Sequence, residues 1–217
     1  STDFIGANYH YPEADYATRA RIWQEHRDYT LGFLHFLATS PRVPTSMRQE
    51  MQHYGMAQDE FPDTGGWPRQ LYVREARRMI SDLVMTEHHT FGRQVAASPV
   101  SLGSYGTDTH EIRRIVKDGV VTREGKTATG RGGAPPYGIG YGAVVPKTAE
   151  CDNLFVTFAV SASHTAFSSI RMEPVFMATS QSAATAACLA IDTTIPAHPV
   201  PYANPQQRPN RNGKDHR

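Results

Sequence analysis

The sequence has little of several features that would assign a function class directly. Two cysteines, Cys151 and Cys188, lie far apart without a Cys-x-x-Cys pattern, so we expect buried thiols rather than a zinc or redox motif, and a disulfide between them stays open. The 22 basic and 21 acidic side chains leave a net charge of +1, which gives no electrostatic basis for binding nucleic acid or an anionic membrane. We read no apolar run that approaches the ~20 residues needed for a membrane span.

Histidine is present, but not in a pattern that holds a metal. Of the 10 histidines, His88 and His89 are adjacent. On a helix their side chains would point about 100° apart, and on a strand they would face opposite ways. Neither arrangement gives the i, i+4 pair that chelates zinc. We therefore expect a polar turn at residues 87–89 and no metal site.

Residues 1–66 are predicted to form a helical lobe. Asp15 is a plausible N-cap for a helix that runs to about Leu37, and Phe33 and Phe36 widen its apolar face, so we expect burial on more than one side. A second helix with Met47, Met51 and Tyr54 on one face should stop at Gly55. The apolar positions of the first helix are Ala20, Trp23, Thr30, Leu31, Leu34 and Ala38.

Residues 67–150 are predicted to form a mixed β-sheet region. Strand candidates are residues 71–80, 100–105 and 119–122, and the glycine-rich segment 130–142 indicates an irregular loop that leads into residues 143–146. Residues 193–217 carry repeated prolines among polar side chains, so we expect a disordered tail from about Pro196.

Residues 151–192 combine a predicted strand with a predicted helix. The apolar run 153–160 is typical of a buried strand, and Pro174 suits the first turn of a helix that is rich in alanine and serine. The free N–H groups at that helix start would attract negative charge. A well-packed alanine-rich helix explains the composition equally well.

Five ordered blocks of the sequence resemble one family. Over residues 1–192 the chain is similar to the C-terminal portion of bacterial FAD-dependent oxidoreductases, in the glutathione-reductase-like FAD/NAD(P)-binding superfamily and its xanthan-lyase-like group. The resemblance implies an α+β fold with a helical lobe, a mixed β-sheet cap and a strand and helix that close the FAD site. It also implies FAD as cofactor and a small-molecule substrate, with a hint of carbohydrate-related oxidation. The blocks are residues 66–79, 103–110, 136–141, 145–147 and 161–187.

The N-terminal dinucleotide-binding βαβ unit of that family has no counterpart in the sequence. We find no Gly-x-Gly-x-x-Gly after a strand, and the cluster Gly130–Gly133 lies in a polar loop. We therefore expect a fragment, a truncated gene product or one half of a split protein. By itself it should not retain FAD, its partner would be the missing N-terminal FAD-binding half, and its compartment stays open between cytoplasmic and exported.

Three residues are candidates for catalysis: His110 and Arg171 from their residue types and positions, and His164 from the resemblance. Arg171 would meet a flavin carbonyl or a substrate carboxylate, or else pair with Glu173 or a loop carboxylate. His164 would face the isoalloxazine edge, or be a satisfied turn histidine. Asp108 and His110 could form an acid/base pair, or a polar turn in which Asp108 caps a helix near Glu111. The expected cofactor-binding residues are Ser163, His164, Arg171, Met172, Glu173, Gln181 and Ser182.

A second function remains open alongside the enzyme. Without a dinucleotide-binding unit, the faces of residues 153–191 would lose their cover and expose apolar surface. In that case the chain is a cofactor-free domain that acts only as an interaction or subunit module.

Overall fold

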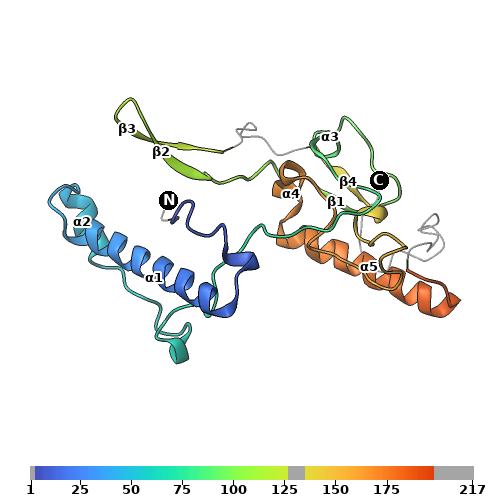
Figure 1. Ribbon diagram of the computed structural model, residues 1–217, viewed down its shortest axis with the longest axis horizontal. Helices are drawn as coiled ribbons and strands as arrows, with labels where there is room; N and C mark the ends of the chain where they lie inside the picture. Colours follow the sequence, from blue (N-terminus) through green and yellow to red (C-terminus); the bar gives the residue numbers. More distant parts are fainter. Residues whose placement is uncertain (1–2, 127–134, 198–217) are drawn as a thin grey trace. The chain divides into compact units, whose positions relative to one another are not determined.

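The computed structural model describes residues 3–126 and 135–197 (Figure 1). The chain divides into two compact units, one of Ser1–Ala76 with Glu111–Gly125 and the other of Arg77–His110 with Lys126–Arg217. This division groups residues by packing, and the four-part division expected from the sequence stays a prediction. The glycine cluster Gly130–Gly133 and the tail beyond Ala197 lie outside the described residues.

The first unit is built on a long helix. The elements in chain order are η1 (Tyr11–Glu13), α1 (Tyr16–Thr39), α2 (Thr45–Met51) and η2 (Pro62–Thr64). The predicted N-cap is confirmed, because the Asp15 carboxylate accepts a 2.7 Å hydrogen bond from the Thr18 N–H. The predicted stop at Gly55 is wrong, since α2 ends at Met51 with Gln52 as its C-cap.

The expectation that α1 is buried on more than one side is wrong. Within this fully described helix the one buried residue is Ile22, while Leu31 and Leu34 are 43% and 38% exposed. The cause is a shortage of cover: in the first unit, α2 and the loop around η2 are too short to enclose a helix of 24 residues.

A β-hairpin completes the first unit. β2 (Arg113–Lys117) and β3 (Val120–Glu124) pair antiparallel. Asp118 and Gly119 connect them with φ values of 52° and 74°, which is the left-handed backbone of a tight hairpin turn. The strand expected near 119–122 is therefore confirmed, and the helix expected near Glu111 is wrong because β-branched residues flank an Asp-Gly turn.

The second unit contains the larger core. β1 (Pro99–Gly103) pairs antiparallel with β4 (Tyr137–Gly140), which continues into η3 (Tyr141–Ala143). The strand expected at 100–105 is thus confirmed, whereas β4 lies where an irregular loop was expected. Among the described residues the sheets are two separate antiparallel pairs, so the mixed sheet is a wrong prediction, although helices with small sheets do make an α+β protein.

The strands expected at 71–80 and 153–160 do not form. Both segments are irregular, with bends at 74–75 and 157–159, and they form only isolated backbone hydrogen bonds, such as Met79 N–H to the Ala159 carbonyl at 2.9 Å and Ser161 N–H to the Ala143 carbonyl at 2.9 Å. One parallel bridge joins Met85 to Ala162. Val160 is nevertheless fully buried, so the sequence pattern predicts burial correctly and a continuous ladder incorrectly.

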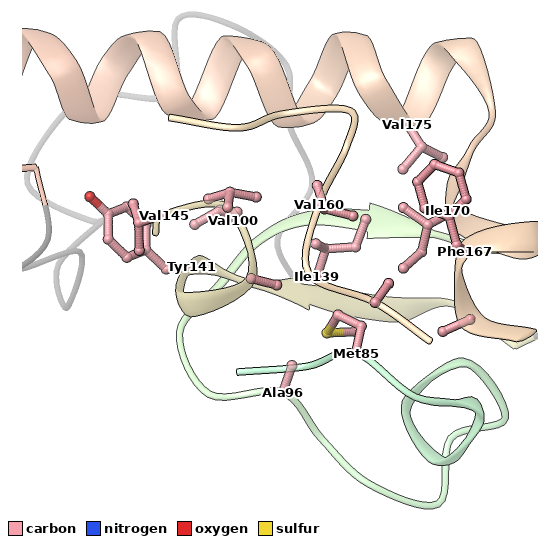
Figure 2. Close-up of a cluster of buried hydrophobic side chains, with 14 of the residues drawn as sticks. Met85, Ala96, Val100, Ile139, Tyr141, Val145, Val160, Phe167, Ile170 and Val175 are labelled. Carbon is pink, nitrogen blue, oxygen red and sulfur yellow. The ribbon is translucent and has the colours of Figure 1, made fainter. Parts of the chain in front are cut away.

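Three helices cover this core. They are α3 (Glu87–Thr90), α4 (His164–Ile170) and α5 (Glu173–Thr193). The helix expected from Pro174 is confirmed as α5, which packs on β1. Figure 2 shows Phe167, Ile170 and Val175 gathered at one end of the cluster and Tyr141 and Val145 at the other.

Gly140 illustrates how the glycines near β4 serve packing. A Cβ added at Gly140 would lie 2.4 Å from the Leu83 Cδ2 atom and 2.9 Å from the Ala97 carbonyl oxygen. Because the second contact is with backbone, the neighbour cannot move away cheaply. Segments 83 and 96–97 therefore approach β4 closely only because this position is glycine.

Helix α5 bears on two expectations, that no apolar run reaches membrane-spanning length and that the cysteines are buried. Among the described residues, α5 is long and apolar enough to cross a membrane by length and composition, with 28% of its best window buried. Its Thr179 and Ser182 hydroxyls bond inward to β1 at Ser101 and Val100, as in a helix packed on a protein core. Both cysteines are free, and Cys188 on α5 is exposed, so it is not a buried thiol.

Candidate functional site

The C-terminal end of α4 binds the loop that follows β1. The Ser169 hydroxyl donates to the Tyr105 carbonyl at 2.5 Å, and the Asp108 N–H donates to the Ser168 carbonyl at 3.2 Å. The Arg171 guanidinium donates to the Asp108 carbonyl at 2.6 Å. These three hydrogen bonds from Ser168, Ser169 and Arg171 thus fix loop 105–110 on the end of α4.

The Asp108 carboxylate lies between two of the predicted catalytic residues. One oxygen is 3.6 Å from Arg171 Nη2 and the other is 3.9 Å from His110 Nε2. The Arg171 side chain is 5% exposed, whereas the His110 and Asp108 side chains are 40% and 39% exposed. The cation therefore supports the carboxylate from the protein side and the imidazole occupies its open side.

This arrangement bears on both alternatives raised by the sequence. Arg171 forms an ion pair with the carboxylate of Asp108, as the alternative of a loop carboxylate partner predicted. The same carboxylate also faces His110. Asp108 caps no helix, because the chain continues into strand β2. At 3.9 Å the Asp108 carboxylate is at ion-pair distance from the His110 imidazole rather than hydrogen-bonded to it, a placement in which the carboxylate can stabilise the charged ring during proton transfer.

His164 lies apart from this group. It is the exposed first residue of α4, next to Ser163, whose hydroxyl accepts the Ala166 N–H at 3.2 Å as the N-cap. Because α4 has seven residues and an α-helix rises about 1.5 Å per residue, His164 and Arg171 are about 10 Å apart along its axis. The structure thus brings His110 and Arg171 together and leaves His164 at the other end of the helix.

The remaining predicted cofactor residues lie on α5. Met172 is its N-cap and supplies no side-chain hydrogen bond to the first turn, where Glu173 and Pro174 follow. Gln181 is exposed. Ser182 is 2% exposed and donates to the Val100 carbonyl, so its hydroxyl holds the helix on β1.

The serine that stands before Gln181 has a visible role. The resemblance leads one to expect glycine there, because a helix face in close contact with a ligand favours a small residue. The Ser180 hydroxyl instead donates to the Thr157 hydroxyl at 2.9 Å. It thereby links α5 to the irregular segment 153–160.

His89 is a residue whose environment the sequence did not reveal. Residues 87–89 form the short helix α3 rather than a turn, and His89 is 3% exposed. The Thr86 N–H donates to His89 Nδ1 at 3.0 Å, so the neutral ring carries its proton on Nε2. That nitrogen is buried without a hydrogen-bond partner among the described residues. The Thr-x-x-His spacing of a helix cap was the available signal.

Tyr137 joins the strands to the same helix end. Its hydroxyl lies 2.6 Å from the Ser169 hydroxyl, and burial raises the pKa of Tyr137 to about 12. The ring is accommodated by Gly103, where an added Cβ would lie 2.7 Å from the Tyr137 hydroxyl. Tyr137 is therefore a neutral structural link at any ordinary pH.

Comparison with known proteins assigns the family. A family model described as FAD dependent oxidoreductase matches residues 1–208. The chain belongs to the FAD-dependent oxidoreductase family. No curated protein and no solved structure matches it. The family resemblance read from the sequence blocks is thus confirmed at this level, and FAD is the cofactor of the family.

The described residues of this family member fit one end of FAD better than the other. The buried Nε2 of His89 has no partner among the described residues, and the first turn of α5 has no side-chain cap; groups of either kind could donate to a carbonyl or nitrogen of a flavin ring. For the pyrophosphate, no described strand leads through a glycine turn into a helix. β4 continues into a 3-10 turn instead.

Proposed function

We propose that this chain is the C-terminal part of an FAD-dependent oxidoreductase, which provides the substrate cap and the isoalloxazine-side contacts for hydride transfer to the flavin. The observation that supports it best is the Asp108 carboxylate held between Arg171 and His110. An acid/base pair on an anchored loop is what the oxidation of an alcohol or amine requires, because a proton must leave the substrate as the hydride does.

The residues of the site have separate roles in this proposal. FAD, when bound, supplies the hydride acceptor. The His110 imidazole receives the substrate proton, with its Nε2 directed at Asp108. Asp108 orients that ring and stabilises its charged form, and Arg171 holds Asp108 from the buried side. Ser163, Met172, Glu173 and Gln181 lie at the helix starts and on the exposed side of α5, where they would border the flavin.

The substrate class and the finer family group are also proposals. We infer a small-molecule substrate, carbohydrate-related as in the xanthan-lyase-like group of the glutathione-reductase-like FAD/NAD(P)-binding superfamily. The exposed position of His110 supports a substrate that approaches from solvent.

The partner in this proposal is an FAD-binding half that covers α5. The outer face of α5 exposes Met177 and Ile191 at 71% and 77%, and Phe158 beside it is 65% exposed. Apolar side chains so exposed favour a partner surface. That half would also supply the pyrophosphate site that the described residues lack.

Flavin stoichiometry tests the proposal directly. The chain purified alone should carry no stoichiometric flavin by visible absorbance, whereas co-purification with an FAD-binding half should give one flavin per chain. In that assembly His110→Gln should slow anaerobic flavin reduction by substrate without releasing the flavin. One flavin per isolated chain would disprove the need for a partner, and normal reduction by the His110 variant would remove His110 from the chemistry.

A cofactor-free interaction module is the second candidate, and one observation favours it. An apolar pocket of about 480 Å³ opens at the C-terminal end of α5, next to the exposed apolar residues of that helix. Such a surface can bind a protein segment without any cofactor. Flavin in the purified assembly decides between the two functions. The pocket is lined by Asn153, Phe155, Ala187, Ala190, Ile191, Thr194, Ile195, Pro196 and Ala197.

A further inference from the structure

An arginine on α1 contacts the rings of both tryptophans of the sequence. The Arg27 guanidinium carbon lies 5.8 Å from the centre of the Trp23 ring and 5.4 Å from that of Trp67. All three residues belong to the first unit. Both distances lie within the ~6 Å of a cation–π contact, so two rings contact the same cation.

Hydrogen bonds fix the Trp23 indole and the main chain of Trp67. Trp23 Nε1–H donates to the Pro68 carbonyl at 2.9 Å, and the Thr64 hydroxyl donates to the Trp67 carbonyl at 2.5 Å. The turn that presents Trp67 holds Phe61 in the left-handed region at φ 51°, which is rare for an aromatic residue. The Gly66 N–H closes this turn by donating to the Phe61 carbonyl at 2.8 Å.

Arg27 has ring contacts but no anion. Its Nε is buried without a hydrogen-bond partner, and no ion pair or hydrogen bond to Arg27 occurs among residues 3–126 and 135–197. Neighbouring charges are otherwise engaged: Asp28 accepts from Gln24 at 2.7 Å, and Arg69 pairs with Asp63. The ring contacts leave the in-plane donors of the guanidinium open to an acceptor, because Arg27 is only half-buried although its Nε is covered.

We propose that Trp23, Arg27 and Trp67 form a binding site for a small carboxylate with an aromatic or other apolar body. The planar guanidinium fork matches a carboxylate, and the indoles offer apolar contact for the rest of the molecule. One unpaired cation balances one negative charge, which favours a carboxylate over a doubly charged phosphate. The site lies in the first unit and does not depend on the flavin proposal.

The two tryptophans make the test specific, because all tryptophan fluorescence of the chain comes from this site. Phenylacetate should change that fluorescence saturably, and its neutral amide, phenylacetamide, should not. Arg27→Gln should abolish the response and Arg27→Lys should weaken binding by about tenfold. Arg21→Gln is the matched control, since Arg21 is an exposed arginine on the same helix, paired with Glu25 at 3.9 Å, and should bind as the unchanged chain does.

Three results would overturn the proposal. They are the absence of a saturable response to phenylacetate, equal binding of acid and amide, and a response to inorganic phosphate in its place. Circular dichroism checks the fold of each variant. If Arg27→Gln unfolds, the acid and amide comparison on the unchanged chain still decides the outcome.

Discussion

The hydroxyl groups of Tyr137 and Ser169 lie 2.6 Å apart, and this contact joins β4 to the helix end that carries the candidate site. Ser169 continues the chain of hydrogen bonds to the Tyr105 carbonyl. The loop with Asp108 and His110 is therefore attached to the core through two buried hydroxyls. Stability of the core and geometry of the site are coupled at this point.

Tyr137 should make stability depend on pH only in strong alkali. Its folded-state pKa is raised from 10.0 to about 12, so the folded protein keeps a proton that the unfolded chain loses. The contribution of Tyr137 to the free energy of unfolding is fully present below pH 10. We expect that free energy to fall by about 2–3 kcal/mol as the pH rises from 10 to 12. Urea unfolding across that range measures it. Tyr137→Phe should lower the unfolding free energy by about 1 kcal/mol at neutral pH, and it should remove the decrease between pH 10 and 12. If the variant still loses the same stability over that range, another group causes the decrease.

Ser163 should act as a helix cap. Its hydroxyl accepts the Ala166 N–H at the start of α4, so Ser163→Ala should cost about 1 kcal/mol of unfolding free energy, and Ser163→Thr should restore most of it. Thermal or urea unfolding provides the measurement. If Ser163→Ala keeps full stability but weakens flavin binding in the assembled protein, the residue serves the cofactor rather than the helix.

Arg171 should affect the reaction more than the fold. In the flavin-containing assembly, Arg171→Ala should lower the rate of flavin reduction on the order of 10²-fold. Arg171→Lys should recover only part of that rate, because an ammonium group lacks the planar fork. Stopped-flow reduction and the melting temperature of the same variant are compared. A lower melting temperature with normal reduction would make Arg171 a structural partner of Asp108 alone.

Gly140 should tolerate no side chain. Alanine there would place its Cβ against the Ala97 carbonyl oxygen and Leu83, so Gly140→Ala should cost about 1–3 kcal/mol through overpacking. Gly55→Ala is the control, because nothing lies within 4 Å of a Cβ at that position, and its stability should change little. Equal stability of the two variants would show that β4 can shift away from its neighbours.

Local signals in the sequence predicted local structure well. The N-cap at Asp15 and the position of Pro174 in a first helical turn both depend only on neighbours within one helical turn. The local sequence was therefore enough to predict them. Residues 153–160 failed as a strand because a strand also needs a partner in register, and that partner is a distant segment. The predicted burial of α1 was wrong for a related reason. Amphipathic spacing predicts that a helix has an apolar face, but it does not predict whether another segment covers that face.

The candidate site was predicted in part for the same reason. His110 and Arg171 were named separately from their sequence blocks, but their link through Asp108 depends on how loop 105–110 folds onto α4. His89 was read as a turn residue because its burial arises from α4 and β4 packing on α3. Arg27 had no signal in the sequence at all, because one of its two indole contacts comes from residue 67.

The hairpin of β2 and β3 belongs to the first unit although its residues interrupt the second. The chain therefore passes from one unit to the other at three points, after residues 76, 110 and 125. Each unit is thus built from two segments that are separated in the sequence by a segment of the other unit. A ribosome that has released only residues 1–76 has not yet made all of the first unit. The second unit must wait still longer for α5, so its N-terminal segments remain without their core partner during most of synthesis. Cutting the chain at any single crossing cannot yield two complete units, because the piece 1–125 that holds all of the first unit and the piece 77–217 that holds all of the second overlap in residues 77–125.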